Sequence, residues 1–249
     1  MKAIIIAAGS SSRLGNLTKD VPKGMIIING KSIIERQLMI FKKFGITDIT
    51  IITGPQSEKF NFKNVQYVSD DNYSEHDVLG SMMAARPIMN DELIFSYSDI
   101  LFDESVFEKI LHFQGDIGIG VDLDWEKAYD DRSEHPKEQA DNVVIQNNEI
   151  VKIKKNISQI SLKQNLGEFI GLTKLSKNGC QIFIKKYLEL QKSHIGKFQN
   201  ASSFKKSYLT DILQELINNK EKISPIIING DWCEIDTPQD LEKAKILFS

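Results

Sequence analysis

Apolar runs alternate along the chain with amphipathic segments, and this pattern predicts strands and helices in turn. Residues 2–7 form a continuous apolar run that ends in a Gly/Ser loop, as is typical of a strand buried on both faces. Residues 31–44 carry Ile34, Leu38 and Phe41 on one helical face, and Gly45 follows as a C-cap. The other predicted strands are 48–53, 65–68, 92–97, 116–121, 167–173 and 225–229, and the other predicted helices are 77–86, 104–113, 175–190, 208–218 and 238–248. Repeated β-α-β units of this kind predict an α/β fold with a mostly parallel sheet flanked by helices.

The pattern changes between residues 122 and 173. Residues 122–141 are polar and irregular, and the next two strand-like runs, 142–146 and 149–154, are joined through Asn147 and Asn148 as in a β-hairpin. The sequence has no internal repeat and no linker rich in proline and serine. We therefore expect one domain over residues 1–249 with an insertion at about 122–173. A homodimer in which the hairpin pairs between subunits is one arrangement that this pattern allows.

Composition and charge exclude several classes of protein. The chain has 249 residues, 41% of them hydrophobic, and a formal charge of −3 without a basic stripe, which argues against binding to the nucleic-acid backbone. Cys180 and Cys233 lie far apart and form no metal-binding pattern, so free thiols in a reducing compartment are expected. No apolar run approaches the roughly 20 residues that span a bilayer. We expect a cytoplasmic protein without nucleic-acid or membrane partners.

The loop after the first predicted strand is the first stretch that suggests chemistry. Its backbone N–H groups can face phosphate oxygens, and its place at the carboxyl end of a strand is where open α/β sheets bind ligands. Arg13 offers a planar fork for phosphate, and Lys23 offers a compact point charge. The alternative is a tight turn with two solvated basic residues. Neither GxGxxG nor GxxxxGK[ST] occurs, which disfavours a dinucleotide-binding domain and a P-loop NTPase.

Two aspartates follow strands of apolar residues. Asp99 ends the strand predicted at 92–97, and Asp236 precedes the last predicted helix. Carboxylates that converge on one edge of a sheet repel each other unless a cation lies between them, and Mg²⁺ prefers carboxylates together with phosphate oxygens. The alternative is that Asp99 merely ends a strand while Asp236 or Thr237 caps the final helix.

Three ordered motifs resemble those of the nucleotidyltransferase family, which contains sugar-nucleotide pyrophosphorylases and small cytidylyltransferases. The motifs are AAGSSSRLG (7–15) with VPK (21–23), LIFSYSD (93–99) and EIDTPQDL (234–241). The resemblance implies a Rossmann-like nucleotidyltransferase fold in which the first loop holds a nucleoside triphosphate. It also implies that Arg13 contacts the β- and γ-phosphates, that Lys23 contacts the α-phosphate, and that Asp99 and Asp236 bind Mg²⁺. Ser98 stands where the family usually has glycine.

A second part of the nucleotide site is implied by the predicted helix 77–86. Gly80 and Ser81 resemble the serine-containing turn near the base and ribose, although many relatives have asparagine where this chain has Asp77. The resemblance thus assigns nucleotide binding to Ala7, Ala8, Gly9, Ser10, Ser11, Ser12, Arg13, Lys23, Asp77, Gly80, Ser81 and Asp99. It makes Arg13 and Lys23 the catalytic pair.

The insertion is the expected acceptor-binding element. Its aromatic and acidic side chains could hold an amine by cation–π and charge contacts, and Arg132 could bind a carboxylate or phosphate; the alternative is a surface loop. The pattern DxDWxxxYxxRxxHP (122–136) and the segment GEFIG (167–171) are similar to segments of cytidylyltransferases that act on small phosphorylated or phosphonate metabolites. The resemblance assigns acceptor binding to Asp122, Trp125, Tyr129, Arg132, His135, Glu168 and Gly171.

The resulting hypothesis is a Mg²⁺-dependent transfer of CMP from CTP to a small acceptor, with release of pyrophosphate. The acceptors implied are 2-aminoethylphosphonate, phosphocholine or a phospho-amino acid such as L-glutamine phosphate, activated for a surface polysaccharide or lipid. The alternatives are a sugar-phosphate nucleotidyltransferase, a methylerythritol-phosphate cytidylyltransferase and a non-catalytic nucleotide-binding module of the same fold. The last is disfavoured because such a module would be expected to lose Lys23 or the metal-binding aspartates.

Overall fold

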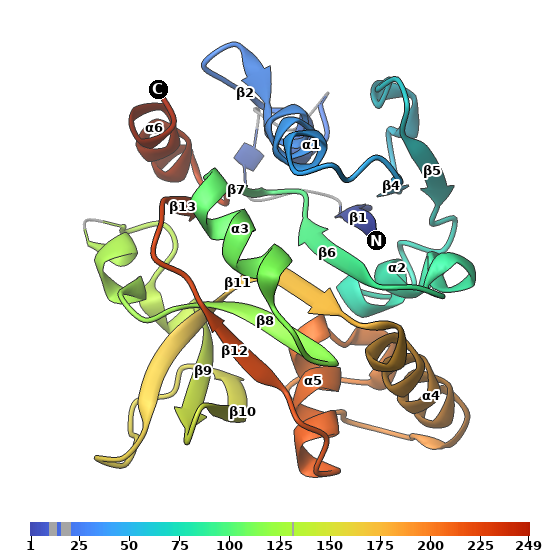
Figure 1. Cartoon of the computed structure of the whole chain (residues 1–249), viewed down its shortest axis with the longest axis vertical. Coiled ribbons are helices and arrows are strands. Elements are labelled where there is room, and N and C mark those ends of the chain that lie inside the picture. The colour runs from blue at the N-terminus through green and yellow to red at the C-terminus, as the bar shows by residue number, and fades with distance from the viewer. Residues whose placement is uncertain (10–13, 16–20, 131) are drawn as a thin grey trace.

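Parallel strands from the N-terminal half form one side of the central sheet (Figure 1). The computed structural model describes residues 1–9, 14–15, 21–130 and 132–249. Strand β1 (Lys2–Ala7) lies between β4 (Ile49–Thr53) and β6 (Leu93–Tyr97) and is parallel to both. Strand β5 (Gln66–Ser69) pairs in parallel with β4 at the edge. The carboxyl ends of β1 and β6 therefore meet at one edge of the sheet.

The C-terminal half joins this sheet through β11 (Asn165–Leu175), which is antiparallel to β6. Strand β11 also pairs with β8 (Ile117–Asp122) and with β9 (Asp141–Gln146) of the hairpin β9–β10 (Glu149–Lys155). Strand β12 (Ser224–Ile227) lies parallel to β8. The expected mixed, mostly parallel sheet with a hairpin is confirmed, and at 165–175 the central antiparallel strand is longer than the predicted 167–173.

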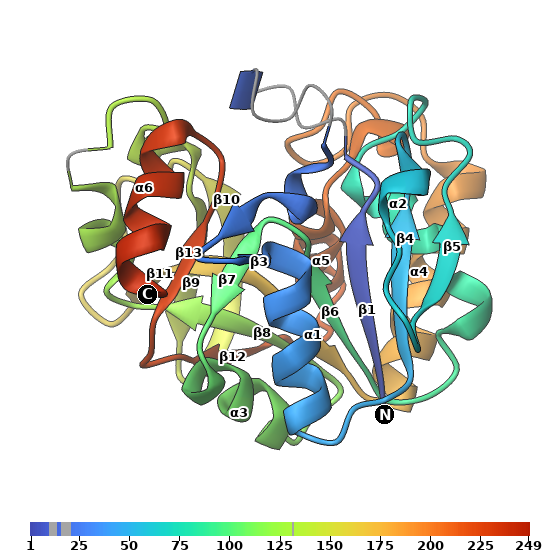
Figure 2. The ribbon, with the colours of Figure 1, turned by 90° about the horizontal axis from the view of Figure 1, so that it is seen from above.

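Helices cover both faces of the sheet, and the alternating side chains of β1 explain why its sequence is apolar throughout. The helices are α1 (Ile33–Lys43), α2 (Val78–Ala84), α3 (Glu104–His112), α4 (Lys177–Ser193), α5 (Leu209–Asn218) and α6 (Pro238–Leu247). Ala3 and Ile5 pack with α1 and α3, whereas Ile4 and Ile6 pack with α2, α4 and α5. Figure 2 shows α1 in front of the sheet and α4 and α5 behind it. Within the described residues, no helix combines the length and apolar character needed to cross a bilayer.

The predicted helix over residues 77–86 is shorter in the structure. Helix α2 ends at Ala84, and a 3₁₀ turn (Arg86–Ile88) follows that contains Pro87. Proline interrupts an α-helix because it lacks the N–H and clashes with the preceding turn. Further short 3₁₀ turns are Lys23–Met25, Ser57–Lys59, Trp125–Tyr129, Lys137–Gln139 and Phe204–Lys206, and β2 (Ile27–Ile28) pairs with β3 (Lys31–Ser32).

One pairing that the apolar pattern did not predict determines the geometry of the site. Strand β7 (Ile100–Phe102) pairs antiparallel with β13 (Trp232–Glu234), and the backbone N–H of Ile235 donates to the carbonyl of Asp99 at 2.9 Å. The two strands are only three residues long, below the usual length of a strand recognised by alternation. Their pairing places residue 99 beside residue 236, although the two are far apart in the sequence.

Deleting a buried leucine side chain tests the packing of α5 on the sheet. Leu213 is fully buried in the cluster between α5 and the sheet, whereas Leu162 is fully exposed. We expect Leu213→Ala to lower the free energy of unfolding by about 2–5 kcal/mol because it leaves a cavity. The matched Leu162→Ala variant should stay within about 0.5 kcal/mol of wild type in the same urea titration. Equal losses in both variants would contradict this account of the core.

Candidate active site

A cleft of about 600 Å³ lies at the carboxyl ends of β1 and β6. Residues from the end of β1, from the end of β6 and from α2 line it, and the sequence-predicted positions among them are Ala7, Ala8, Gly9, Lys23, Asp77, Ser81, Asp99 and Asp236. Ligands bind at this edge in open α/β sheets because loops and helix starts converge there. The predicted positions Ser10, Ser11, Ser12 and Arg13 lie outside the described residues.

Lys23 connects the two predicted metal-binding aspartates. Its ammonium contacts Asp99 Oδ2 at 2.7 Å and also Asp236 Oδ1. Burial by itself lowers the pKa of Lys23, but the negative charges of Asp99, Asp236 and Glu234 outweigh that effect and raise it overall. Lys23 is therefore a permanent cation between two acids. The sequence expectation that these three side chains meet is confirmed, whereas their chemical roles stay predictions.

The start of α6 explains why Asp236 is available to the cleft. The hydroxyl of Thr237 accepts the backbone N–H of Asp240, and the Asp240 carboxylate accepts the backbone N–H groups of Asp236 and Thr237. Thr237 and Asp240 thus form the capping box of this helix. Of the two caps that the sequence allowed, the structure has Thr237, and the side chain of Asp236 turns to Lys23.

The carboxylates of Asp99 and Asp236 fit a divalent cation. Asp99 Oδ1 is buried and has no hydrogen-bond partner among the described residues. A buried carboxylate oxygen without a donor is unfavourable unless a ligand or ion satisfies it. Two carboxylates that already share one cation suit Mg²⁺, which takes carboxylate and phosphate oxygens.

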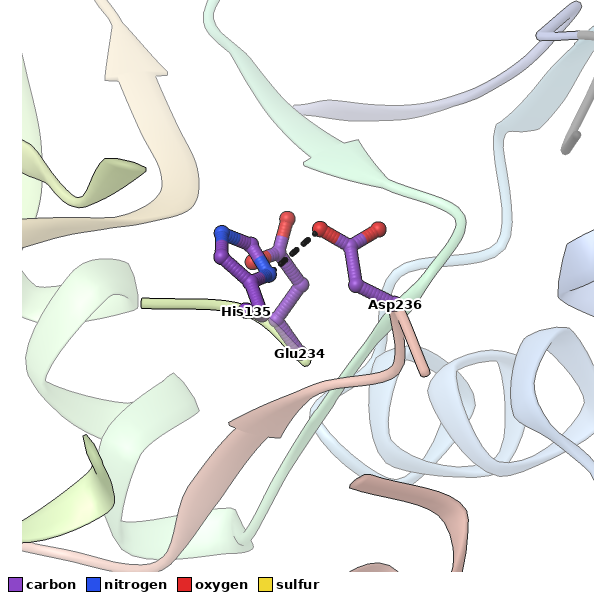
Figure 3. Close-up of side chains that lie close together, drawn as sticks. All are labelled: His135, Glu234 and Asp236. Carbon is purple, nitrogen blue, oxygen red and sulfur yellow. Dashed lines mark ion pairs between the residues drawn. The ribbon is translucent and has the colours of Figure 1, made fainter. Parts of the chain in front are cut away.

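A second group of side chains lies on the other side of Asp236 (Figure 3). His135 Nδ1 lies 2.9 Å from Asp236 Oδ2, and Glu234 lies beside both, so that one ligand atom from each residue falls within 4.8 Å of the others. Burial raises the pKa of Glu234 to about 8, and repulsion by Asp236 and Asp99 contributes to the rise. Glu234 therefore takes up a proton more readily than an exposed glutamate does.

Three of the side chains predicted to bind the acceptor contact other side chains of the protein, and their role toward an acceptor stays a prediction. Tyr129 donates to Glu168 Oε1 at 2.5 Å, and Trp125 packs against Tyr129 in a small buried cluster. Arg132 donates to Asp240 Oδ2 at 2.9 Å and stacks 4.9 Å from the centre of the Tyr129 ring. These contacts join Tyr129 to β11 and Arg132 to α6, so Arg132 has a protein carboxylate as its partner.

The remaining predicted acceptor residues line two further cavities. His135, Glu168 and Gly171 line a chamber of about 60 Å³ beside the cleft. Asp122, Arg132 and Glu168 line a groove of about 880 Å³ against α6. Trp125 and Tyr129 belong to the buried cluster described above.

Close packing requires glycine at two of the predicted site positions. Gly171 has a φ of 82°, and a Cβ there would lie 2.9 Å from the ring of Tyr97, so the bulge in β11 needs glycine. A Cβ at Gly80 would lie 2.2 Å from the ring of His76, so Gly80 makes room for that ring beside Asp77 rather than lining the cleft.

Several residues that line the cleft were not predicted. They are Tyr73, Ser74, His76, Asp141, Lys155, Lys206, Tyr208 and Glu234. Lys155 ends β10 and lines both the cleft and the chamber, and its ammonium lies 5.8 Å from the centre of the Tyr208 ring. A lysine at the end of a hairpin gives no signal in the sequence because most such lysines are solvated.

Comparison with known proteins identifies relatives of the whole chain. Residues 3–121 match the model of the MobA-like NTP transferase domain. A CTP:phosphoglutamine cytidylyltransferase from Campylobacter jejuni is 30% identical over 253 aligned positions, which cover 97% of this chain and 98% of the relative. A choline-phosphate cytidylyltransferase from Streptococcus pneumoniae is 33% identical over 106 positions, 41% of this chain and 46% of the relative.

Solved structures share the fold. The inositol-1-phosphate CTP transferase from T. maritima superposes with a TM-score of 0.75 at 23% identity, over 99% of this chain and 94% of that one. The CTP:phosphocholine cytidylyltransferase from S. pneumoniae has the same TM-score at 20% identity, over 100% and 99% of the two chains. The motifs, the sheet with Lys23, Asp99 and Asp236 at its edge, and the full-length relationship agree. The chain belongs to the nucleotidyltransferase family, with a MobA-like NTP transferase domain.

Proposed function

We propose that the chain is a cytidylyltransferase that transfers CMP from CTP to a small phosphorylated acceptor. The observation that carries this proposal is the position of Lys23 between Asp99 and Asp236 in the cleft at the end of β1. Three charged groups at that edge suit a triphosphate and a cation. The full-length similarity to a CTP:phosphoglutamine cytidylyltransferase favours CTP as the donor and a phospho-amino acid as the acceptor.

The reaction is an in-line displacement at the α-phosphorus of CTP. An acceptor phosphate oxygen forms the new P–O bond while the bond to the β-phosphate bridging oxygen breaks, and pyrophosphate leaves with that oxygen. The acceptor is already an anion, so the step needs no strong general base. Catalysis then depends on positioning and on neutralising charge, which is the task proposed for the permanently charged Lys23 and, by its family resemblance, for Arg13.

Asp99 and Asp236 are the residues proposed to hold Mg²⁺. Their convergence and the unsatisfied Asp99 Oδ1 support this assignment. A bound Mg²⁺ would neutralise charge on the phosphate oxygens of the nucleotide. Lys23 then has a second task, because its charge reduces the repulsion between Asp99 and Asp236.

The cleft suits an acceptor that carries both charges. Lys155 offers a cation for a phosphate, whereas Asp141 and Glu234, which line the same cleft, favour a protonated amine. A phosphorylated amino acid has both groups. We propose that its CDP-activated product is made in the cytoplasm and serves a surface polysaccharide or lipid.

A substrate matrix tests the proposed reaction. Each of the four nucleoside triphosphates is combined with Mg²⁺ and with phosphoglutamine, phosphocholine, 2-aminoethylphosphonate or glucose 1-phosphate, and pyrophosphate release is measured. We expect the highest kcat/KM for CTP with phosphoglutamine. Turnover of the sugar phosphate alone would contradict the proposed acceptor class, and absence of turnover with every pair would contradict catalysis.

Removal of the Lys23 ammonium should affect turnover more than acceptor binding. We expect Lys23→Ala to reduce kcat by about 10²–10³ while the KM of the acceptor changes little, because the charge acts on the phosphate that is attacked. Lys42→Ala, on the exposed side of α1, is the control and should behave as wild type. A near-normal kcat in a Lys23→Ala variant that melts cooperatively would disprove the role of this lysine.

Chelation should stop the reaction. We expect EDTA to abolish pyrophosphate release and added Mg²⁺ to restore it. Asp236→Asn should raise the Mg²⁺ concentration for half-maximal rate by at least about tenfold. Loss of a residue that merely hydrogen-bonds to a metal ligand already weakens metal affinity about tenfold or more. Asp91→Asn, at the opposite end of β6, is the control. Full activity in EDTA would rule out the proposed metal.

A further inference from the structure

The chamber beside the cleft is lined by an unusual number of potential metal ligands. Its volume is about 60 Å³, and its wall includes His135, Glu168, Glu234 and Asp236. A cavity volume of roughly 10–15 Å³ is enough for one water molecule, so the chamber has room for a metal ion together with water.

Three side chains from separate segments present ligand atoms to one point. One ligand atom from each of His135, Glu234 and Asp236 lies within 4.8 Å of the other two (Figure 3). His135 belongs to the insertion, Glu234 ends β13, and Asp236 precedes α6. Asp236 directs its oxygens to different partners, with Oδ1 toward Lys23 and Oδ2 toward His135. It can therefore serve the proposed Mg²⁺ site and a second site at once.

A further carboxylate in the chamber wall, that of Glu168, has one oxygen without a partner among the described residues. Glu168 is 5% exposed, and its Oε1 accepts the Tyr129 hydroxyl. Its Oε2 is buried without a hydrogen-bond partner among the described residues. A buried carboxylate oxygen without a donor is costly, and a bound cation would remove that cost.

The Nδ1 atom of His135 has two competing neighbours. Nδ1 lies 3.1 Å from the Arg132 guanidinium and 2.9 Å from Asp236 Oδ2. One ring nitrogen cannot accept a hydrogen bond from Arg132 and donate one to Asp236 at the same time. Arg132 has Asp240 as another partner, so the imidazole nitrogen can leave it for a metal.

We propose that His135, Glu234 and Asp236 bind a divalent transition-metal ion, such as Mn²⁺, Co²⁺ or Zn²⁺, at a second site that shares Asp236 with the proposed Mg²⁺ site. An imidazole nitrogen selects for these metals over Mg²⁺, which prefers oxygen ligands alone. The chamber and the cleft share Glu234 and Asp236 in their walls. The ion would therefore add positive charge where an acceptor phosphate arrives; this consequence rests on the proposed function, whereas binding of the ion does not.

Cobalt binding to the full-length protein tests the site without any substrate. The chain is freed of metal and titrated with Co²⁺ in excess Mg²⁺, and visible absorption of the bound Co²⁺ is recorded. We expect one Co²⁺ per wild-type chain. His135→Gln should weaken Co²⁺ binding at least about tenfold. Loss of a ligand should reduce metal affinity at least as much as loss of a residue that hydrogen-bonds to a ligand. His112→Gln, on α3, is the matched control and should bind as wild type.

The outcomes separate this proposal from the proposed function. Absence of Co²⁺ absorption in wild type, or unchanged binding in His135→Gln, would overturn the second site whatever the transferase assay shows. If His135→Gln loses its cooperative melting transition, the ring nitrogen signals of His135 are followed by NMR in wild type instead. A shift on addition of Zn²⁺ then supports the site, and unchanged signals reject it. A chain that binds Co²⁺ but transfers no CMP would contradict only the cytidylyltransferase assignment.

Discussion

The candidate site depends on one electrostatic constraint: the buried Asp236 and the partly buried Asp99 share the single ammonium of Lys23. Asp236 is 1% exposed, and Asp99 has an oxygen that no described residue satisfies. In a medium of low dielectric constant such a pair would repel strongly without Lys23 between them. The pairing of β7 with β13 holds the backbone next to both acids, so that the two residues stay side by side. The two carboxylates at this edge of the sheet are thus already arranged around a positive charge before any ligand binds.

Two residues of the insertion that the resemblance assigns to acceptor binding also make contacts within the protein. Tyr129 and Arg132 have the chemistry to hold an acceptor, yet each pairs with a protein carboxylate, Glu168 or Asp240. These bonds join Tyr129 to β11 and Arg132 to the cap of α6. The side chain of Lys155, which no motif indicated, lines the cleft instead. Resemblance gave the positions of these residues but not their partners.

Acidic groups concentrate where the cleft and the chamber meet. Burial holds the pKa of both Glu168 and Glu234 near 8, so each carboxyl is protonated more readily than an exposed one. Such an arrangement is unfavourable for an isolated chain, and proteins keep it where a cation or substrate compensates the charge. The same excess of carboxylates supports an amine-bearing acceptor in the cleft and a metal ion in the chamber.

The sequence by itself determined the strands and helices of the sheet, because the apolar run of β1 and the periodic faces of α1 and α3 are local properties. Its motifs also indicated that Lys23, Asp99 and Asp236 belong together. Only the tertiary structure decided that Thr237 rather than Asp236 caps α6, that Arg132 binds Asp240, and that Lys155 and Glu234 face the cleft. These outcomes depend on the pairing of strands as short as β7 and β13 and on contacts between distant segments. Contacts between distant segments form only when the sheet assembles. The local propensity of each segment therefore does not predict them.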